Sequence, residues 1–220
     1  MFHRWPSMLD EDTEVLAVQL PGRGARLKEP PYRHMTPLIA DLVEAVRPKL
    51  DVPFAIFGHS LGAFVGFELT RALRQAGDPA PVGLFVSARS APQLPPLPPR
   101  TEPIHQLPPA QFFSALEKRY GLADRTLQDP DMAAMMYPAL RADMEIIETA
   151  EYAHEEPLTS RIMACGGLQD LTINRESLEA WRAQTSQGFS SHMLNGNHFY
   201  LMSDPFPLVK LVRDSLAGDG

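Results

Sequence analysis

Short apolar segments alternate with helical patterns along most of this 220-residue chain, and this alternation constrains the fold more than any other feature. Buried strands are predicted at 14–20, 54–57, 82–87, 161–165 and 189–194. Amphipathic helices are predicted at 37–46, 61–76, 176–184 and 205–216. Strands that alternate with helices favour an α/β fold, in which a mostly parallel sheet carries helices on both faces.

A proline-rich stretch interrupts this alternation after the third predicted strand. Eight of the 22 prolines lie between Pro92 and Pro109, and such a cluster favours a semi-rigid surface loop. Helices are predicted at 109–120 and 131–151, and Pro138 should kink or divide the second. Methionines at 132–144 either belong to the core or line a pliable pocket. We expect one domain over 1–220, with a helical insertion at about 90–155.

Composition excludes several classes of function. The net charge of −7 and the pI near 5.5 argue against a nucleic-acid or anionic-membrane binder, because either needs a clustered positive surface. Cys165 is the only cysteine, so an intrachain disulfide and a cysteine-built zinc site are both excluded. The chain shows neither a leader pattern nor an apolar run of the roughly 18 residues that a membrane span requires. We expect a cytoplasmic, soluble protein.

Residues 58–62 read Gly-His-Ser-Leu-Gly and match the pattern G-x-S-x-G. In that pattern a sharp turn between a strand and a helix exposes the serine hydroxyl as a nucleophile. The pattern alone is weak, because a glycine-rich turn with an incidental serine also produces it. Here it falls between a predicted strand and a predicted helix, and this context favours Ser60 as a nucleophile.

A serine nucleophile needs a base that removes its proton and an acid that orients the base. In folds of this class the order along the chain is serine, acid, histidine. Asp170 and His198 follow the fourth and fifth predicted strands, at the ends where a parallel sheet presents its site. His192 lies inside a predicted strand, and Asp204 precedes a proline and suits a helix cap. We therefore predict Ser60, Asp170 and His198 as a catalytic triad.

Four segments of the chain resemble motifs of the stand-alone type II thioesterases of polyketide synthases and non-ribosomal peptide synthetases. They are the run at 15–24 ending in Pro-Gly-Arg-Gly, the serine turn at 58–63, the glycine pair ahead of Asp170, and Gly-Asn-His-Phe-Tyr-Leu at 196–201. The resemblance implies an α/β-hydrolase fold with a helical lid over an acyl chamber. It also implies hydrolysis of acyl groups from the phosphopantetheine thioester of acyl or peptidyl carrier domains. Ser60 would attack, His198 would relay the proton and Asp170 would orient His198, with no metal or organic cofactor.

The chain departs from that family at its beginning. Members begin with a strand and a loop resembling Pro-His-Ala-Gly-Gly, whose backbone supplies one oxyanion donor, and this sequence starts after both. The backbone N–H of Leu61 would be the other donor. The absent strand would lie between 14–20 and 54–57, so we expect the 220-residue chain to be poorly soluble or nearly inactive.

Two other functions remain open from the residues. One is a carboxylesterase or acyl thioesterase that acts without a carrier partner. The other is a truncated, inactive homologue that binds carrier domains without hydrolysing their thioesters.

Overall fold

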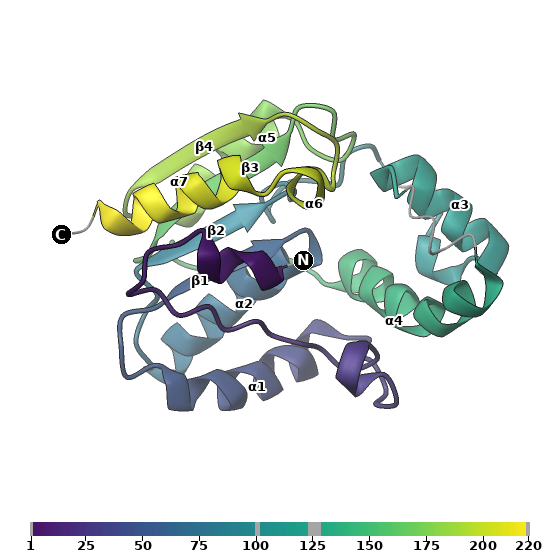
Figure 1. The fold of residues 1–220 in the computed structure, drawn as a ribbon, viewed down its shortest axis with the longest axis horizontal. Coiled ribbons are helices and arrows are strands. Elements are labelled where there is room, and N and C mark those ends of the chain that lie inside the picture. Colours follow the sequence, from purple (N-terminus) through teal and green to yellow (C-terminus); the bar gives the residue numbers. More distant parts are fainter. Residues whose placement is uncertain (1, 100–101, 123–128, 219–220) are drawn as a thin grey trace.

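Four parallel strands form the sheet of the computed structural model, which describes residues 2–99, 102–122 and 129–218 (Figure 1). The strands are β1 (Ala55–His59), β2 (Gly83–Ser87), β3 (Arg161–Gly167) and β4 (Phe189–Leu194). Their spatial order follows the chain, β1-β2-β3-β4, and all three pairings are parallel. The carboxyl ends of all four strands therefore lie along one edge of the sheet.

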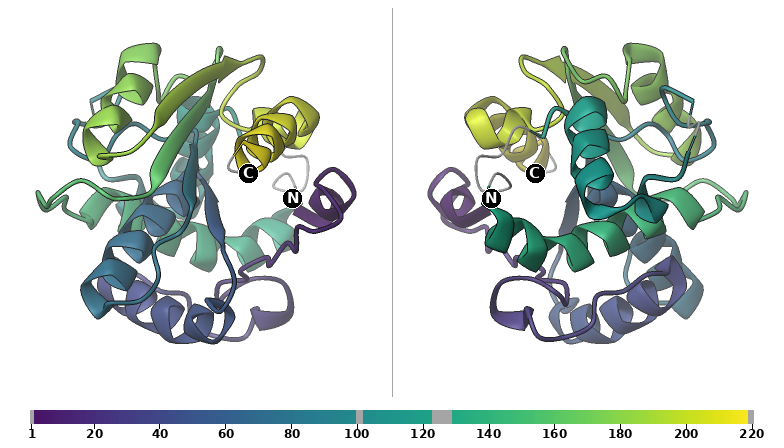
Figure 2. Two further views of the ribbon diagram at one scale, coloured as in Figure 1. Left: turned by 90° about the vertical axis from the view of Figure 1, so that its left-hand side faces the viewer. Right: turned by 90° about the vertical axis from the view of Figure 1, so that its right-hand side faces the viewer.

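Helices cover both faces of this sheet, as the two side views show (Figure 2). One face carries α2 (Leu61–Ala76), α5 (Arg175–Glu179) and the 3-10 helix η6 (Ala180–Gln184), and α1 (Met35–Val46) packs outside α2. The other face carries the 3-10 helix η1 (Phe2–Ser7), α6 (Tyr200–Ser203) and α7 (Phe206–Ala217). Two short 3-10 helices, η2 (Gly24–Arg26) and η3 (Arg47–Lys49), lie in the connections on either side of α1.

Strand β2 is buried along its whole length and divides the core into two layers. Leu84 and Val86 pack on the α2 and α5 side, whereas Phe85 packs among residues of η1, α6 and α7. Trp181 of η6 is fully buried and meets Phe67 of α2 edge to face, with ring centroids 5.4 Å apart. The strict alternation of side chains along β2 accounts for both layers.

A helical insertion separates β2 from β3 and lies to one side of the sheet (Figure 1). It contains η4 (Ile104–Gln106), α3 (Pro109–Tyr120) and α4 (Pro130–Thr149). Of the two effects predicted for Pro138, a kink or a division, division does not occur, because helix α4 continues through this proline. The residues on either side of Pro138 are well packed. The Tyr137 ring lies 5.2 Å from the Phe112 ring, and Ala139 is buried. This packing holds the helix together across the proline.

The predicted strand at 14–20 is also wrong. These residues form neither a helix nor a strand, and Leu16 and Val18 are 56% and 60% exposed. A strand requires a neighbour with which to share hydrogen bonds, and β1 is an edge strand of the sheet within the described residues. The hydrophobic side chains of η1 instead cover β1, since the Trp5 ring lies 4.6 Å from the Phe57 ring.

The remaining predicted strands and helices are confirmed, with ends that differ by two residues or fewer. The segment predicted as helix 176–184 divides into α5 and η6. None of the helices in the described ranges is both long enough and apolar enough to cross a membrane.

Candidate active site

The sheet edge formed by the carboxyl ends of the strands gathers the polar residues predicted from the sequence. Ser60 follows β1 directly, Asp170 follows β3 and His198 follows β4. The loop after β2 adds Arg89, which the sequence reasoning did not select. Parallel strands thus bring together side chains that lie up to 138 positions apart in the chain.

Ser60 occupies a tight turn between β1 and α2. Its backbone has φ 55° and ψ −113°, in a region that residues other than glycine seldom adopt. Gly58 makes the turn possible, because a Cβ atom on it would lie 2.0 Å from the carbonyl oxygen of Gly62. The turn is anchored by the Ser60 N–H, which donates to the Ser87 carbonyl at 2.8 Å. This geometry places the Ser60 hydroxyl at the sheet edge.

A chain of hydrogen bonds links the three predicted triad residues. His198 Nε2 lies 2.9 Å from Ser60 Oγ, and His198 Nδ1 lies 2.8 Å from Asp170 Oδ2. Both His198 and the Asp170 side chain are buried. An imidazole bonded in this way has one nitrogen facing the hydroxyl and the other held by the carboxylate, as base catalysis requires.

Asp170 remains ionised although it is buried. Burial opposes its charge, but the hydrogen bond and the charge of His198, together with donors from Thr172, bring the pKa of Asp170 below its usual value. The Thr172 hydroxyl donates to Asp170 Oδ1 at 2.7 Å, and the Thr172 N–H donates to the same oxygen at 2.8 Å. Thr172 therefore occupies the carboxylate oxygen that His198 does not use.

Sequence reasoning missed Thr172. A threonine two positions after an aspartate is the spacing of an Asx turn, in which the side-chain oxygen accepts the N–H two residues on. This spacing could have pointed to Thr172 in the sequence, but it is common in loops. It indicates a role for Thr172 only once Asp170 is known to lie beside His198.

A buried polar network lies behind the nucleophile. His59 Nδ1 lies 2.9 Å from Ser87 Oγ, which in turn lies 2.7 Å from the Tyr200 hydroxyl. Burial, with a smaller contribution from the charge of His198, lowers the pKa of His59 to about 3, so its ring stays neutral. The network connects the ends of β1 and β2 to the helix that follows His198.

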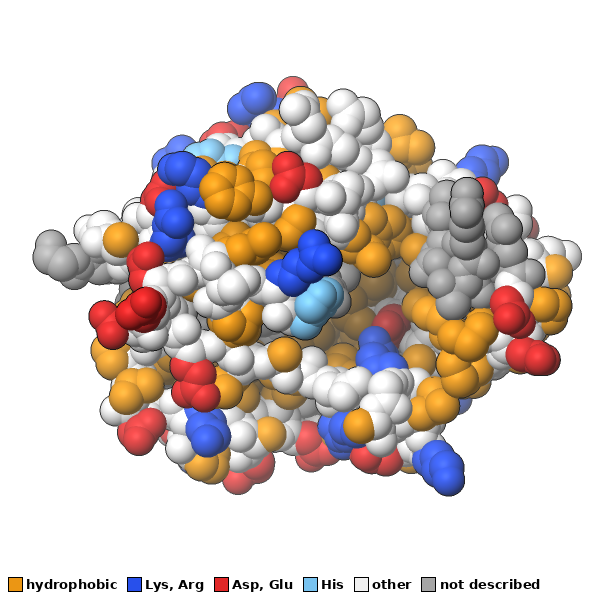
Figure 3. All heavy atoms as spheres, viewed as in Figure 1, with side chains coloured by type: hydrophobic (Ala, Val, Ile, Leu, Met, Phe, Trp, Pro, Cys, Tyr) orange, Lys and Arg blue, Asp and Glu red, His pale blue; other side chains and the backbone are white. Residues whose placement is uncertain are grey.

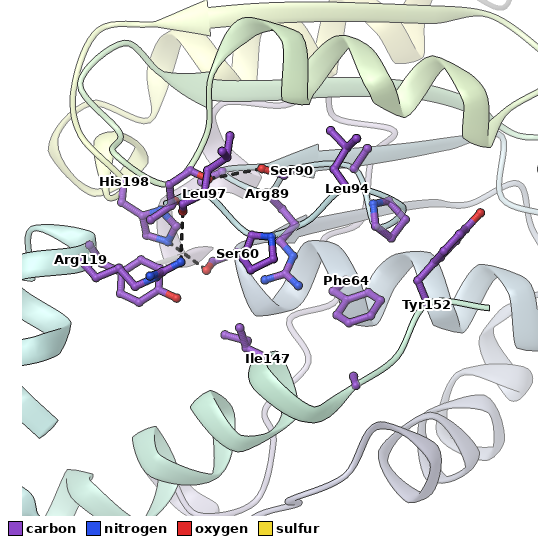
Figure 4. Close-up of a pocket in the computed structure, with 17 residues that line it drawn as sticks. Ser60, Phe64, Arg89, Ser90, Leu94, Leu97, Arg119, Ile147, Tyr152 and His198 are labelled. Atoms are coloured by element: carbon purple, nitrogen blue, oxygen red, sulfur yellow. Dashed lines mark hydrogen bonds between the residues drawn. The ribbon is translucent and has the colours of Figure 1, made fainter. Parts of the chain in front are cut away.

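A cavity of about 140 Å³ lies beside Ser60 and His198 (Figure 4). Its walls include Phe64 of α2, the loop after β2, Tyr120 of α3 and Ile147 of α4. The methionines at 132–144 do not border it. Met144 belongs to the core and Met135 is 40% exposed, so the suggestion that this helix face lines a pocket is wrong.

The insertion is attached to the rest of the protein by ion pairs at α4. Arg23, from the Pro-Gly-Arg-Gly run, makes a two-pronged pair with Asp143 at 2.7 and 2.9 Å. Arg33 makes a similar pair with Glu145 at 2.6 and 2.9 Å. Paired planar groups of this kind fix orientation as well as distance. They hold the second half of α4 next to the cavity.

The other candidate residues have local roles in the structure. His192 lies within β4 opposite Cys165, and Asp204 accepts the N–H of Phe206 at the start of α7. Burial raises the pKa of the Cys165 thiol to about 12, so the thiol is not an activated nucleophile. Leu61 is the first residue of α2, where the N–H groups of a helix lack partners within the helix.

Comparisons with known proteins identify the family to which this chain belongs. The Thioesterase domain family matches residues 1–216. The chain is 37% identical to the gramicidin S biosynthesis protein GrsT of Aneurinibacillus migulanus, over 98% of this chain and 83% of that protein. It is 36% identical to the thioesterase PikA5 of Streptomyces venezuelae, over 98% of this chain and 75% of that protein.

A solved structure shows the same similarity in three dimensions. RedJ, a thioesterase from the prodiginine biosynthetic pathway of Streptomyces coelicolor, superposes with a TM-score of 0.88 at 33% identity. The match covers 97% of this chain and 79% of RedJ. The family match and these relatives extend over nearly the whole chain, and the chain therefore belongs to the thioesterase domain family.

Proposed function

We propose that this protein is a serine thioesterase that releases acyl groups from the phosphopantetheine arm of carrier domains in natural-product biosynthesis. The observation that carries the proposal is the hydrogen-bonded series from Ser60 through His198 to Asp170. These residues act as nucleophile, general base and orienting acid, respectively. The mechanism uses no metal or organic cofactor.

In the first half of the reaction, Ser60 Oγ attacks the thioester carbonyl while its proton passes to His198 Nε2. The resulting oxyanion requires hydrogen-bond donors, and the first N–H of α2, that of Leu61, would be one of them. The C–S bond then breaks, and the imidazolium of His198 protonates the departing thiolate. The acyl group remains on Ser60 as an ester.

In the second half, His198 removes a proton from water, and the water oxygen attacks the acyl-serine carbonyl. The bond between Ser60 Oγ and the acyl carbon breaks, and His198 returns the proton to Oγ. Asp170 stabilises the imidazolium in both halves, and the donors from Thr172 keep this carboxylate charged and fixed.

Relatives support the carrier-bound substrate. GrsT is named for gramicidin S biosynthesis and RedJ for the prodiginine pathway, so this chain is similar to proteins of two biosynthetic pathways. In such assembly systems the intermediates are thioesters on carrier domains, which are the substrates that the family resemblance implies for this chain.

The helical insertion suits the role of a cover over the acyl group. The Tyr120 ring of α3 lies 4.8 Å from the His198 ring, and Ile147 of α4 borders the cavity. The surface is hollowed between the body of the protein and this insertion, and hydrophobic side chains gather along the hollow (Figure 3). A cover of this kind separates the acyl chain from bulk solvent.

The proposed function can be tested by comparing three butyryl substrates: a loaded peptidyl carrier domain, a free N-acetylcysteamine thioester and a p-nitrophenyl ester. We expect the highest kcat/KM with the carrier and a loss on the order of 10³-fold or more in Ser60→Ala, because the nucleophile is removed. Ser114→Ala, at an exposed position on α3, is the matched control and should retain activity.

Two results would contradict the proposal. Preference for the ester over both thioesters would indicate a carboxylesterase. Binding of the carrier without turnover would indicate an inactive carrier-binding homologue.

The contribution of Thr172 can be measured with Thr172→Val. Loss of the Thr172 hydroxyl donor raises the pKa of Asp170. The acid limb of the pH profile of kcat/KM should therefore move to higher pH. We also expect kcat to fall on the order of tenfold. Thr172→Ser keeps the donor and should restore both values. An unchanged profile in Thr172→Val would show that the hydroxyl does not support the triad.

The cavity wall at α4 should influence acyl length. Ile147→Ala removes buried carbons beside Ser60, so the ratio of kcat/KM for octanoyl over butyryl thioester should rise on the order of tenfold. Met135→Ala, on the same helix but away from the cavity, is the control and should leave the ratio unchanged. Equal ratios in the two variants would place the acyl group elsewhere.

A further inference from the structure

The imidazole of His198 is packed against aromatic rings as well as held by hydrogen bonds. The ring centroids of His59 and Phe199 lie 5.2 and 5.1 Å from that of His198. The centroid of Tyr120 is nearer, at 4.8 Å, and the two ring planes meet at 54°. His59 ends β1 and Phe199 follows His198 directly, whereas Tyr120 is the last residue of α3. The helical insertion therefore supplies part of the surroundings of the proposed base.

The hydrogen bonds of His198 do not fix its ring completely. Its Nδ1 meets Asp170 and its Nε2 meets Ser60, and both nitrogens lie at the edge of the ring. A ring held at two edge atoms can still tilt about the line that joins them, so packing must restrain it. Catalytic side chains keep a productive geometry when packing fixes their conformations. The aromatic rings around His198 meet this need, and His198 is only 2% exposed.

The end of α3 is fitted closely to the loop that carries His198. The helix ends at Gly121, which has φ 67° and donates its N–H to the Glu117 carbonyl at 2.8 Å. A Cβ atom on Gly121 would lie 3.1 Å from Asn197 Nδ2. Glycine suits both the left-handed backbone and this close approach. Two consecutive residues of the loop after β4, Asn197 and His198, thus meet the end of α3.

The last turn of α3 is also tied to the proline-rich loop. Nη2 of Arg119 donates to the carbonyls of Leu97 and Pro98 at 3.1 and 3.0 Å, and Arg119 extends into the cavity from α3 in Figure 4. The guanidinium carbon of Arg119 lies 5.9 Å from the centre of the Tyr120 ring. Earlier in the helix, Phe112 is fully buried in the core. These contacts hold Tyr120 in place beside the imidazole.

We propose that Tyr120 is a positioning residue that sets the orientation of the His198 imidazole toward Ser60. This inference rests on the proposed thioesterase function and adds a residue of the insertion to its machinery. The Tyr120 ring acts by packing, and the Tyr120 hydroxyl takes no part in proton transfer. The aromatic ring is therefore required and the hydroxyl is dispensable.

The first test compares Tyr120→Leu and Tyr120→Phe on the N-acetylcysteamine thioesters of acetate and octanoate. Loss of the ring should lower kcat for both substrates on the order of tenfold or more, because misplacement of a catalytic group by about 1 Å can cost on the order of 10²-fold. KM for the acetyl thioester should not change, because the acetyl group is too short to depend on the cavity wall. Tyr120→Phe should keep the wild-type kcat.

Two further variants complete this test. Tyr120→Met also lacks an aromatic ring and should behave like Tyr120→Leu, so the result does not depend on the folding of one variant. Tyr32→Leu removes a partly buried tyrosine ahead of α1 and is the matched control. It should leave kcat unchanged for both thioesters.

A second measurement follows the imidazole directly and does not depend on turnover. Diethyl pyrocarbonate modifies neutral imidazole nitrogens, and peptide mass spectrometry gives the rate of modification at His198. Because the Tyr120 ring packs on this side chain, the rate should rise in Tyr120→Leu. It should stay at the wild-type value in Tyr120→Phe and in Tyr32→Leu.

Four results would overturn the proposal. They are a wild-type kcat in both variants without the ring, a loss confined to the octanoyl thioester, a loss of kcat in Tyr120→Phe, and an equal rate of His198 modification in all variants. The second would make Tyr120 a wall of the acyl cavity alone, and the third would assign its role to the hydroxyl. Failure of the wild-type protein to hydrolyse either thioester would instead contradict the proposed thioesterase function.

Discussion

The structure depends on one close approach, between Gly58 at the end of β1 and Gly62 at the start of α2. A side chain on Gly58 would overlap the Gly62 carbonyl, so only glycine fits at this position. The same tight turn holds Ser60 at a positive φ. Since β1 to β4 are all parallel, the residues that follow the other strands lie along the same edge. The position of His198 opposite Ser60 is a consequence of this topology.

Electrostatic contacts matter in two parts of the molecule, at the proposed triad and at the attachment of the helical insertion. Behind the proposed triad, His59 remains neutral and Asp170 remains charged, so the imidazole of His198 meets a charged carboxylate at Asp170. At the attachment of the insertion, Arg23 and Arg33 hold α4 through two carboxylates and keep this helix against the cavity. The Pro-Gly-Arg-Gly run thus has a structural role: it lies outside the proposed triad, but its arginine holds the helix that borders the cavity.

Local patterns in the sequence were sufficient to predict the site residues that directly follow strands. Ser60, Asp170 and His198 could be selected because each lies just after an apolar run, and the structure brings the three together. Features that depend on distant partners could not be predicted. The run at 14–20 has the composition of a strand but lacks a paired neighbour in the described structure, and the contact between Arg23 and Asp143 spans 120 positions. The methionines of α4 were apolar and periodic, but periodicity does not show which face meets a cavity.

In the proposed mechanism the acyl group passes through a covalent ester on Ser60. Rapid quenching of the protein with a butyryl-loaded carrier domain, followed by peptide mass spectrometry, measures this directly. We expect a butyryl adduct on the peptide that contains Ser60, which forms before butyrate appears and decays at least as fast as butyrate is released. Turnover at that rate without an adduct on Ser60, or with the adduct on another residue, would contradict it.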